Sequence, residues 1–227
     1  MVRQLCSLFA AAFSVMVAFS AHAYDRFNLY GGLHFSSTLG ETEVTPSLGA
    51  GEKFDLRPTG PSFGGLLGLH LRFGWFGLGG EGEISKLRWN GTTVTRVGGS
   101  VTETELEMDQ GTRMRARLGV HTGNFFIFVA GGGSEADSQM NLQSLNSPGQ
   151  TSRASETLKG SNVGLGFDYA AGEGSLEKRF RLRVEYIMDT YDGTIYRTSR
   201  PNPFFVDRRI EDITAHTFRT VVMFTFF

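Results

Sequence analysis

Charged residues that recur at every second position are the feature of this sequence best suited to do chemistry. Arg113, Arg115 and Arg117 follow this spacing, and so do Glu81 and Glu83 on an earlier segment. A period of two places such residues on one face of a β-strand. If that face is enclosed, the charges must pair, because an unpaired charge in a low dielectric is costly. The sequence therefore predicts a structural ion-pair network, and the alternative is a narrow ion path or gate formed by the same side chains.

We expect ion pairs between opposite charges on neighbouring strands that lie the same number of residues from the short turns at one end of the fold. Three pairs meet this condition: Glu81 with Arg117, Glu83 with Arg115, and Glu185 with Arg219. We interpret these six residues as the structural filling of an interior that is only wide enough for side chains.

Three histidines share the inward face and raise the question of a metal site. His34, His70 and His121 have the alternation of inward residues, but their heights along the strands do not obviously agree. A zinc site needs three or four ligands at one point. We therefore expect neutral histidines within the polar network, and no metal or cofactor.

His34 and Ser36 suggest one enzymatic possibility. The pair is similar to the His and Ser of the outer-membrane lipid A deacylases. In that family the pair comes late in the chain and acts at the lipid-facing surface. Here it comes early, points inward and has no acidic partner identifiable from the sequence. A lipid A-modifying enzyme is therefore the weakest of three functional hypotheses.

Residues 193–209 form the second candidate site and are predicted to be a long exposed loop. The segment combines cations with aromatic side chains, a mixture that suits contact with lipopolysaccharide phosphates or a partner protein. The alternative is that basic residues at the outer rim only neutralise neighbouring lipopolysaccharide. The candidate binding residues are Arg197, Arg200, Phe204, Phe205, Arg208 and Arg209.

Eight segments with period-two alternation are the elements that would position these residues. They cover residues 26–37, 61–73, 77–89, 105–121, 124–135, 157–170, 178–192 and 210–227. Each is close to the ~10 residues that a tilted strand needs to cross a bilayer. The fifth segment is ambiguous, because Phe125–Ala130 is apolar on both faces.

The connections between these segments alternate in length. Those predicted to be long and polar are residues 38–60, 90–104, 136–156 and 193–209, and those predicted to be short are 74–76, 122–123 and 171–177. This layout predicts an all-β fold, an eight-stranded antiparallel up-and-down transmembrane barrel with both termini in the periplasm. In the alternative, a soluble up-and-down barrel, the apolar face would turn to the lumen.

The first 23 residues have the pattern of a cleaved secretory signal. Arg3 precedes an apolar stretch from Leu5 to Phe19, and Ala21-His22-Ala23 has the small-x-small form that a signal peptidase cuts. The apolar stretch is shorter than the ~20 residues of a spanning helix, the rival interpretation. We expect residues 24–227 to form one barrel domain without cysteine, because Cys6 lies in the leader.

Composition supports an exported barrel. The sequence contains 30 Gly and 20 Phe, and glycine at this frequency disfavours helices. Its 22 Lys and Arg and 23 Asp and Glu become 21 and 23 when Arg3 is removed, which leaves a net charge of −2. This balance argues against nucleic-acid binding.

The C-terminal segment carries the family resemblance. Phe218, Val222, Phe224 and Phe226 alternate, and the chain ends on an aromatic residue. This ending resembles the signal that the barrel-assembly machinery reads in outer-membrane barrels, so Phe226 or Phe227 would make that contact. Because Phe227 follows a residue that already completes the pattern, the register of this strand is left open.

The mature chain as a whole resembles the small outer-membrane barrels of the OmpA, OmpX and opacity-type group, including porin-like surface antigens. The resemblance implies a location in the outer membrane of a Gram-negative bacterium. It also implies a monomeric, non-enzymatic surface scaffold, adhesin or envelope-stabilising protein that contacts outer-membrane lipid, lipopolysaccharide and a host or surface protein. A narrow porin-like channel for small solutes or ions is the alternative.

Overall fold

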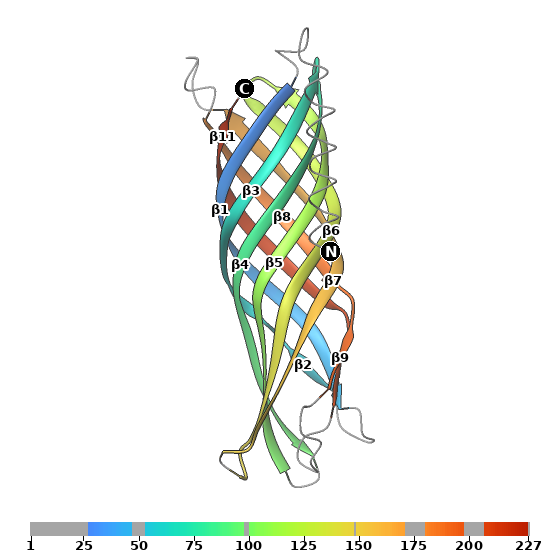
Figure 1. The fold of residues 1–227 in the computed structure, drawn as a ribbon. Helices are drawn as coiled ribbons and strands as arrows, with labels where there is room; N and C mark the ends of the chain where they lie inside the picture. Colours follow the sequence, from blue (N-terminus) through green and yellow to red (C-terminus); the bar gives the residue numbers. More distant parts are fainter. Residues whose placement is uncertain are drawn as a thin grey trace, which may run out of the picture.

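The computed structural model describes residues 27–46, 53–97, 100–147, 149–170, 180–197 and 207–226, and their architecture is a closed antiparallel barrel (Figure 1). Each main strand pairs with the strand before it, and the last pairs with the first, which confirms the predicted ring of eight. The ring consists of β1 (Phe27–Pro46), β3 (Thr59–Phe73), β4 (Phe76–Val97), β5 (Ser100–Thr122), β6 (Phe125–Ser144), β7 (Thr151–Ala170), β8 (Phe180–Tyr191) and β11 (Ile213–Thr225).

Three short strands add a small sheet at the end of the barrel opposite the last residues of β11 (Figure 1). They are β2 (Phe54–Leu56), β9 (Thr194–Tyr196) and β10 (Arg208–Ile210). β2 and β10 pair with the end of β1, and β9 pairs with β10. In the described part of the chain, no helix is long and apolar enough to cross a membrane.

Tight turns connect the strands at the opposite end. Phe73 pairs with Phe76 and Thr122 with Phe125, so each loop has two residues. Gly74 and Gly123 occupy the first loop positions with φ of 63° and 56°, a conformation that glycine adopts without strain. These two turns agree with the predicted short connections, whereas residues 171–177 lie outside the described residues.

The predicted long loops are shorter than expected, because the strands continue through much of them. β4 and β5 pair as far as Val97 and Ser100, and β6 and β7 pair as far as Gln143 and Thr151. The predicted loops at residues 90–104 and 136–156 are therefore largely strand, which corrects the sequence analysis. β5 alone has 23 residues, about twice what a tilted strand needs to cross a bilayer.

A β-bulge divides the long strands into two halves. On β5 the register shifts between Met108 and Gln110, so Asp109 has no partner on β6. An extra residue reverses which side chains point inward, and inward positions change from Leu106 and Met108 to Arg113 and the odd-numbered residues that follow. We call the part between the tight turns and the level of Asp109 the belt half, and the part beyond Asp109 the distal half.

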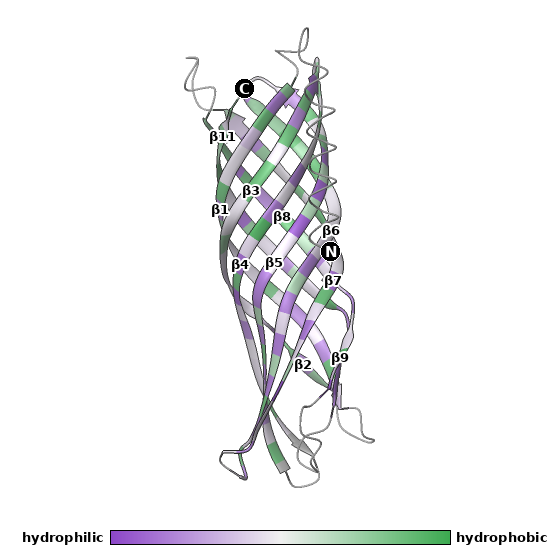
Figure 2. Cartoon of the chain, viewed as in Figure 1, coloured by the Kyte–Doolittle hydropathy of each residue, from purple (hydrophilic) through white to green (hydrophobic). Residues whose placement is uncertain are grey.

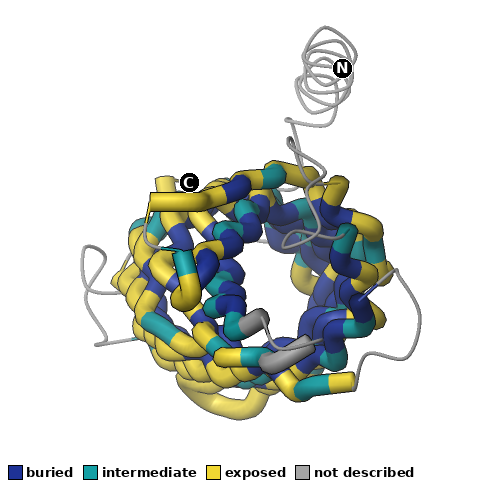
Figure 3. Tube along the Cα trace, turned by 90° about the horizontal axis from the view of Figure 1, so that it is seen from below, coloured by how far each residue is buried: buried dark blue, intermediate teal, exposed yellow. Residues whose placement is uncertain are grey.

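The belt half has an apolar outer surface. Leu33, Phe35, Ile84 and Leu165 are each at least 60% exposed, and in Figure 3 the exposed residues form the outside of the ring while buried residues line it. Aromatic residues, among them Trp75 at 70% exposure, gather near the tight turns. An apolar belt with aromatic borders is the surface that a membrane barrel presents to lipid.

Pairing within the closed ring shows which side chains point inward on the two strands whose orientation or register the sequence left open. On β6, Phe126 and Phe128 point inward and Ile127 points outward. On β11, Phe218 and Phe226 are exposed, and the Phe226 backbone N–H donates to Leu29 O at 2.8 Å. Phe227 lies outside the described residues, and contact of either terminal aromatic with the assembly machinery stays a prediction.

Candidate functional site

The lumen of the belt half holds five arginines and five carboxylates, none more than 5% exposed. They project from five strands, and their formal charges cancel. The set consists of Arg113, Arg115, Arg117, Arg183, Arg219, Glu81, Glu83, Asp168, Glu185 and Asp189. Figure 2 shows hydrophilic and hydrophobic residues interspersed along the strands of the barrel.

Glu81 is the centre of this network. Its Oε2 accepts hydrogen bonds from Arg183 Nη1 at 2.7 Å and from Tyr30 Oη at 3.0 Å. Its Oε1 accepts from Arg219 Nη2 at 3.1 Å and also from Arg115. One carboxylate thus receives donors from four strands, because it projects into the middle of a narrow ring.

A second group of contacts lies nearer the distal half. Arg113 donates to Glu83 Oε1 at 2.6 Å and to both oxygens of Asp189 at 2.9 and 2.8 Å. Glu185 accepts from Arg115 Nη1 at 2.6 Å and from Arg219 Nε at 2.8 Å. Arg113, Glu83 and Glu185 each have more than one charged partner, and Asp189 is held by two hydrogen bonds from Arg113; buried ions are tolerated when they are paired in this way.

The observed pairing between β4 and β5 differs from the pairing predicted by counting residues from the tight turns. Arg115 lies directly opposite Glu81 and Arg113 opposite Glu83. The expected contacts are present but longer, at 3.4 Å between Glu81 and Arg117 and 3.9 Å between Glu83 and Arg115. Neighbouring strands in a tilted barrel are staggered, so positions equally far from the turns are not at equal height. On β8 and β11, Glu185 does face Arg219.

Aromatic rings pack against the network on the side of the tight turns. The Arg117 guanidinium lies 4.8 Å from the Phe128 ring centre and 5.1 Å from that of Tyr30. Arg183 lies 5.1 Å from the same Phe128 ring. These cation–π contacts fill the lumen beside the ion pairs.

The three inward histidines lie at two separate sites in the lumen. His70 Nε2 and His121 Nε2 are 2.9 Å apart, and Phe126 stacks on the His121 ring. The heights of these two histidines do agree, contrary to the sequence analysis, because stagger between strands offsets the residue count. His34 lies elsewhere and contacts Ser85 Oγ at 3.1 Å. Nowhere in the described ranges do three His, Cys, Asp or Glu side chains gather as a metal site would require.

His34 and Ser36 both point into the lumen, but they have separate partners. Ser36 Oγ lies 2.5 Å from Ser62 Oγ, whereas His34 Nε2 is shared between Ser85 and Glu83. A histidine that activates a serine must reach its hydroxyl, and this pair shows no such hydrogen bond. Both side chains are at most 5% exposed and face away from the outer surface.

The distal half has the opposite interior. Its core is apolar and is covered by β2, β9 and β10. The fully buried members are Val44, Leu56, Leu87, Trp89, Leu106, Met108, Ala136, Met140, Leu142, Leu158, Tyr191, Tyr196, Ile210, Ile213 and Ala215. Burial raises the pKa of Tyr196 to about 12, although its hydroxyl lies 2.5 Å from Ser138 Oγ.

The described arginines of the predicted loop 193–209 fall in two environments, exposed and buried. Arg197 and Arg209 are exposed, but Arg208 is only 2% exposed and points into the apolar distal core, 6.0 Å from the Phe54 ring. Its Nε and Nη1 have no hydrogen-bond partner, and burial lowers its pKa. Arg208 is therefore not a solvated rim residue. Arg200, Phe204 and Phe205 lie outside the described residues.

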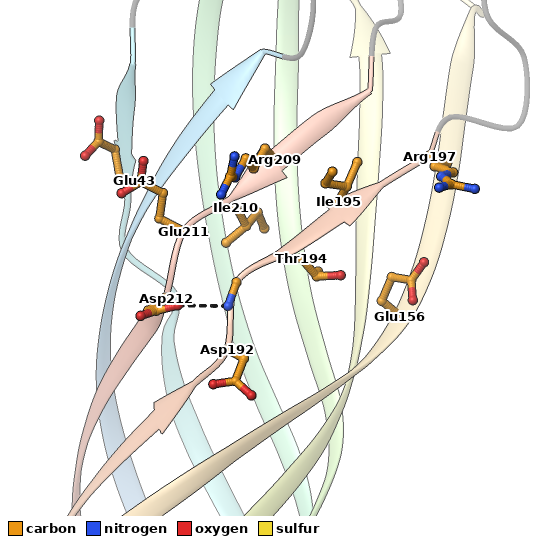
Figure 4. A pocket seen from close by; sticks show the side chains of 11 residues that line it. Glu43, Glu156, Asp192, Thr194, Ile195, Arg197, Arg209, Ile210, Glu211 and Asp212 are labelled. Carbon is orange, nitrogen blue, oxygen red and sulfur yellow. Dashed lines mark hydrogen bonds between the residues drawn. The ribbon is translucent and has the colours of Figure 1, made fainter.

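A hollow of about 1100 Å³ opens in the outer wall of the distal half (Figure 4). Its carboxylates are those of Glu43, Glu156, Asp192, Glu211 and Asp212, and its cations are Arg197 and Arg209. We call it the acidic hollow. Lys53 lies 2.9 Å from Glu43 and 3.2 Å from Glu211, and hydrogen bonds to these two carboxylates raise the pKa of Lys53.

Comparison with known proteins identifies the fold. No family model and no curated protein sequence matches the chain. Among solved structures, the outer-membrane protease OmpT from Escherichia coli is similar with a TM-score of 0.54 at 9% identity, covering 88% of this chain and 97% of OmpT. Ail of Yersinia pestis, solved with the heparin analogue sucrose octasulfate, has a TM-score of 0.40 at 11% identity, covering 86% and 99%.

The similarity to OmpT and the apolar belt define the fold: a small closed β-barrel of the kind found among outer-membrane proteins. At such low identities the likeness concerns the fold and transfers no activity.

Sequence reasoning assigned no partner to four of the ten charged residues of the lumen network. These four are Arg113, Arg183, Asp168 and Asp189. The sequence pattern could have identified them, because each has the period-two spacing of the inward residues on its own segment. The acidic hollow could not be predicted from the sequence pattern, because its formation depends on which strand β9 pairs with.

Proposed function

We propose that this chain is a non-enzymatic surface protein that binds its ligand through the distal half, while the belt half anchors it in the membrane. One observation carries the proposal: the lumen is occupied by mutually paired side chains, whereas the acidic hollow opens to the outside. A partner larger than an ion would therefore meet the outer wall of the distal half. The predicted binding segment 193–209 contributes Thr194, Ile195, Arg197 and Arg209 to that hollow.

The charged lumen favours a narrow channel as the second candidate. A row of arginines and carboxylates can line an ion path. Here, however, Arg113 and Arg115 each bridge two carboxylates across the ring and Arg219 bridges three, so conduction would require several buried ion pairs to separate. The cost of exposing unpaired charges in the lumen makes this the less favoured function.

Lipopolysaccharide is the proposed lateral partner of the barrel. At the edge of the apolar belt next to the distal half, the Arg88 guanidinium lies 5.8 Å from the exposed Phe63 ring, and Lys86 on the same strand forms an ion pair with Asp109. A cation beside an exposed ring at this level suits a lipid with a phosphorylated head group.

The test blocks the hollow sterically with a bulky label, so that the result does not depend on the chemistry of the ligand. Ile195→Cys places a thiol in the acidic hollow, and Thr92→Cys places one on the outside of β4 as the matched control. Cells of a non-adherent strain that display each variant are labelled with a polyethylene glycol maleimide, and adhesion to fibronectin, laminin and heparin coatings is measured. We expect labelling at residue 195 alone to reduce adhesion.

Adhesion no greater than that of the strain without the protein would overturn the proposal. So would stable conductance of the refolded protein in planar bilayers, because it would show that the lumen is open.

A further inference from the structure

The acidic hollow lies where the barrel wall is incomplete. β7 pairs with β8 only from Gly160, opposite Tyr191, toward the tight turns. One more hydrogen bond follows, from Asp192 N–H to Lys159 O at 2.8 Å. Beyond that bond the chain turns away at Gly193, and β9 pairs with β10 instead of β7. Residues 151–158 therefore pair with β6 on one side and with no described strand on the other.

The direction of the free backbone groups follows from the ladder. Lys159 O points toward β8, and the backbone groups of a strand alternate between its two edges. The N–H and C=O groups of Thr157, Ser155 and Arg153 thus point into the gap. Unpaired strand edges of this kind are templates for another strand.

The side chain of Glu156 also marks the opening. By alternation it belongs with Ser152, Ala154 and Leu158, which point inward, yet Glu156 is exposed and lines the hollow (Figure 4). Beneath it, Tyr196 and Ser138 are joined at 2.5 Å. The gap therefore lies in the wall, and its floor is closed by buried side chains.

The charges of the hollow select the kind of strand that fits. Glu43 and Glu211 share Lys53, and Asp212 accepts from the Gly193 N–H at 2.9 Å. Glu156 and Asp192, by contrast, form no ion pair with a described residue. Arg197 and Arg209 also line the hollow, but neither forms an ion pair with these two carboxylates. A strand added at the open edge of β7 would therefore meet two carboxylates that have no ion-pair partner among the described residues.

We propose that an extended segment of a partner protein, with basic side chains at alternate positions, adds to the open edge of β7 and completes the wall in the acidic hollow. Backbone hydrogen bonds to residues 153–157 would supply affinity, and Glu156 and Asp192 would select the basic side chains. This inference rests on the proposed function and names the class of partner.

The test uses the full chain refolded in detergent micelles and an octapeptide of alternating Lys and Thr that carries a fluorophore. Fluorescence anisotropy should show saturable binding that is about tenfold weaker for Glu156→Lys with Asp192→Lys. Glu103→Lys with Glu107→Lys on β5 makes the same change in charge away from the hollow and should bind as the unchanged protein does.

Ser155→Pro separates edge pairing from simple charge attraction. The substitution removes an N–H that points into the gap, at an edge position where proline is tolerated. We expect the variant to remain folded by its heat-dependent shift in SDS gels and to lose peptide binding. The corresponding peptide with N-methyl groups at alternate residues should also fail to bind.

Three results would overturn the inference: no binding of the Lys-Thr peptide, equal binding of a Glu-Thr peptide, or undiminished binding by Ser155→Pro. A doubled mass in light scattering that Ser155→Pro abolishes would also overturn it, because the occupant would then be a second copy. If labelling at residue 195 blocks adhesion while the peptide does not bind, this inference fails and the proposed function stands.

Discussion

The belt half and the distal half share the same strands and have opposite sidedness. In the belt half, residues such as Leu33 and Leu165 point outward and arginines point inward. In the distal half, Leu106 and Met140 point inward, while Glu105 and Gln139 are on the outer face. Lipid stabilises an apolar outside and water a polar one. The medium around each half therefore decides which face of the pleat carries apolar side chains.

The two interiors also depend on different interactions. The belt interior is stabilised by ion pairs that must all be made, since any charge left alone is penalised. The distal interior is stabilised by apolar burial, which tolerates small losses in proportion to the volume removed. The same type of substitution should therefore have different effects in the two halves.

The largest effect is expected for Arg115→Met in the lumen. The change leaves Glu81 and Glu185, both buried, with one donor fewer, and removing one partner of a buried pair costs about 3–5 kcal/mol. Urea unfolding in detergent micelles should show this loss relative to the unchanged protein. A loss below about 1 kcal/mol would mean that the network is hydrated and open.

Leu106→Ala should have the next largest effect, through the distal core. Leu106 is fully buried, so its truncation should cost about 2–5 kcal/mol. Met114→Ala, on the same strand in the apolar belt at 56% exposure, is the matched control and should cost less in the same measurement. Equal losses would show that the distal half has no independent core.

A smaller effect follows from Tyr196, whose pKa burial raises from 10.0 to about 12. Because the folded state holds this proton more tightly, its contribution to stability is complete below pH 10 and is lost as pH rises toward 12. The unchanged protein should lose about 1 kcal/mol more than Tyr196→Phe between pH 9 and pH 11. Parallel pH profiles for the two proteins would contradict the assignment.

Arg208→Met should have the smallest effect and gives the sharpest comparison with Arg115→Met. Arg208 is buried beside Phe54 without an ion pair to any residue in the described ranges. Replacing it by an apolar side chain of similar length should leave stability within about 1 kcal/mol or raise it. A loss as large as that of Arg115→Met would show that both halves depend on charge.

The sequence predicted the ring and the inward face of the charged residues of the belt half, because these follow from the local period of two, but it placed Arg208 wrongly among exposed loop residues. It placed the strand ends poorly. Residues 102–108 have alternation as regular as the belt, but the bulge at Asp109 puts Leu106 and Met108 on the face opposite to the one that the belt phase indicates. A bulge is a property of two paired strands, so one segment read alone does not reveal it.

The sequence by itself determined that Arg115, Arg117 and Glu81 point into a closed interior, since side-chain direction along a strand depends only on the strand. Tertiary structure decided that Arg115 faces Glu81, that Arg208 is buried, and that β9 pairs with β10, so that no described strand pairs with residues 151–158 on the side away from β6. These features depend on stagger and on the choice of strand partners, both of which are fixed only when distant strands close the ring.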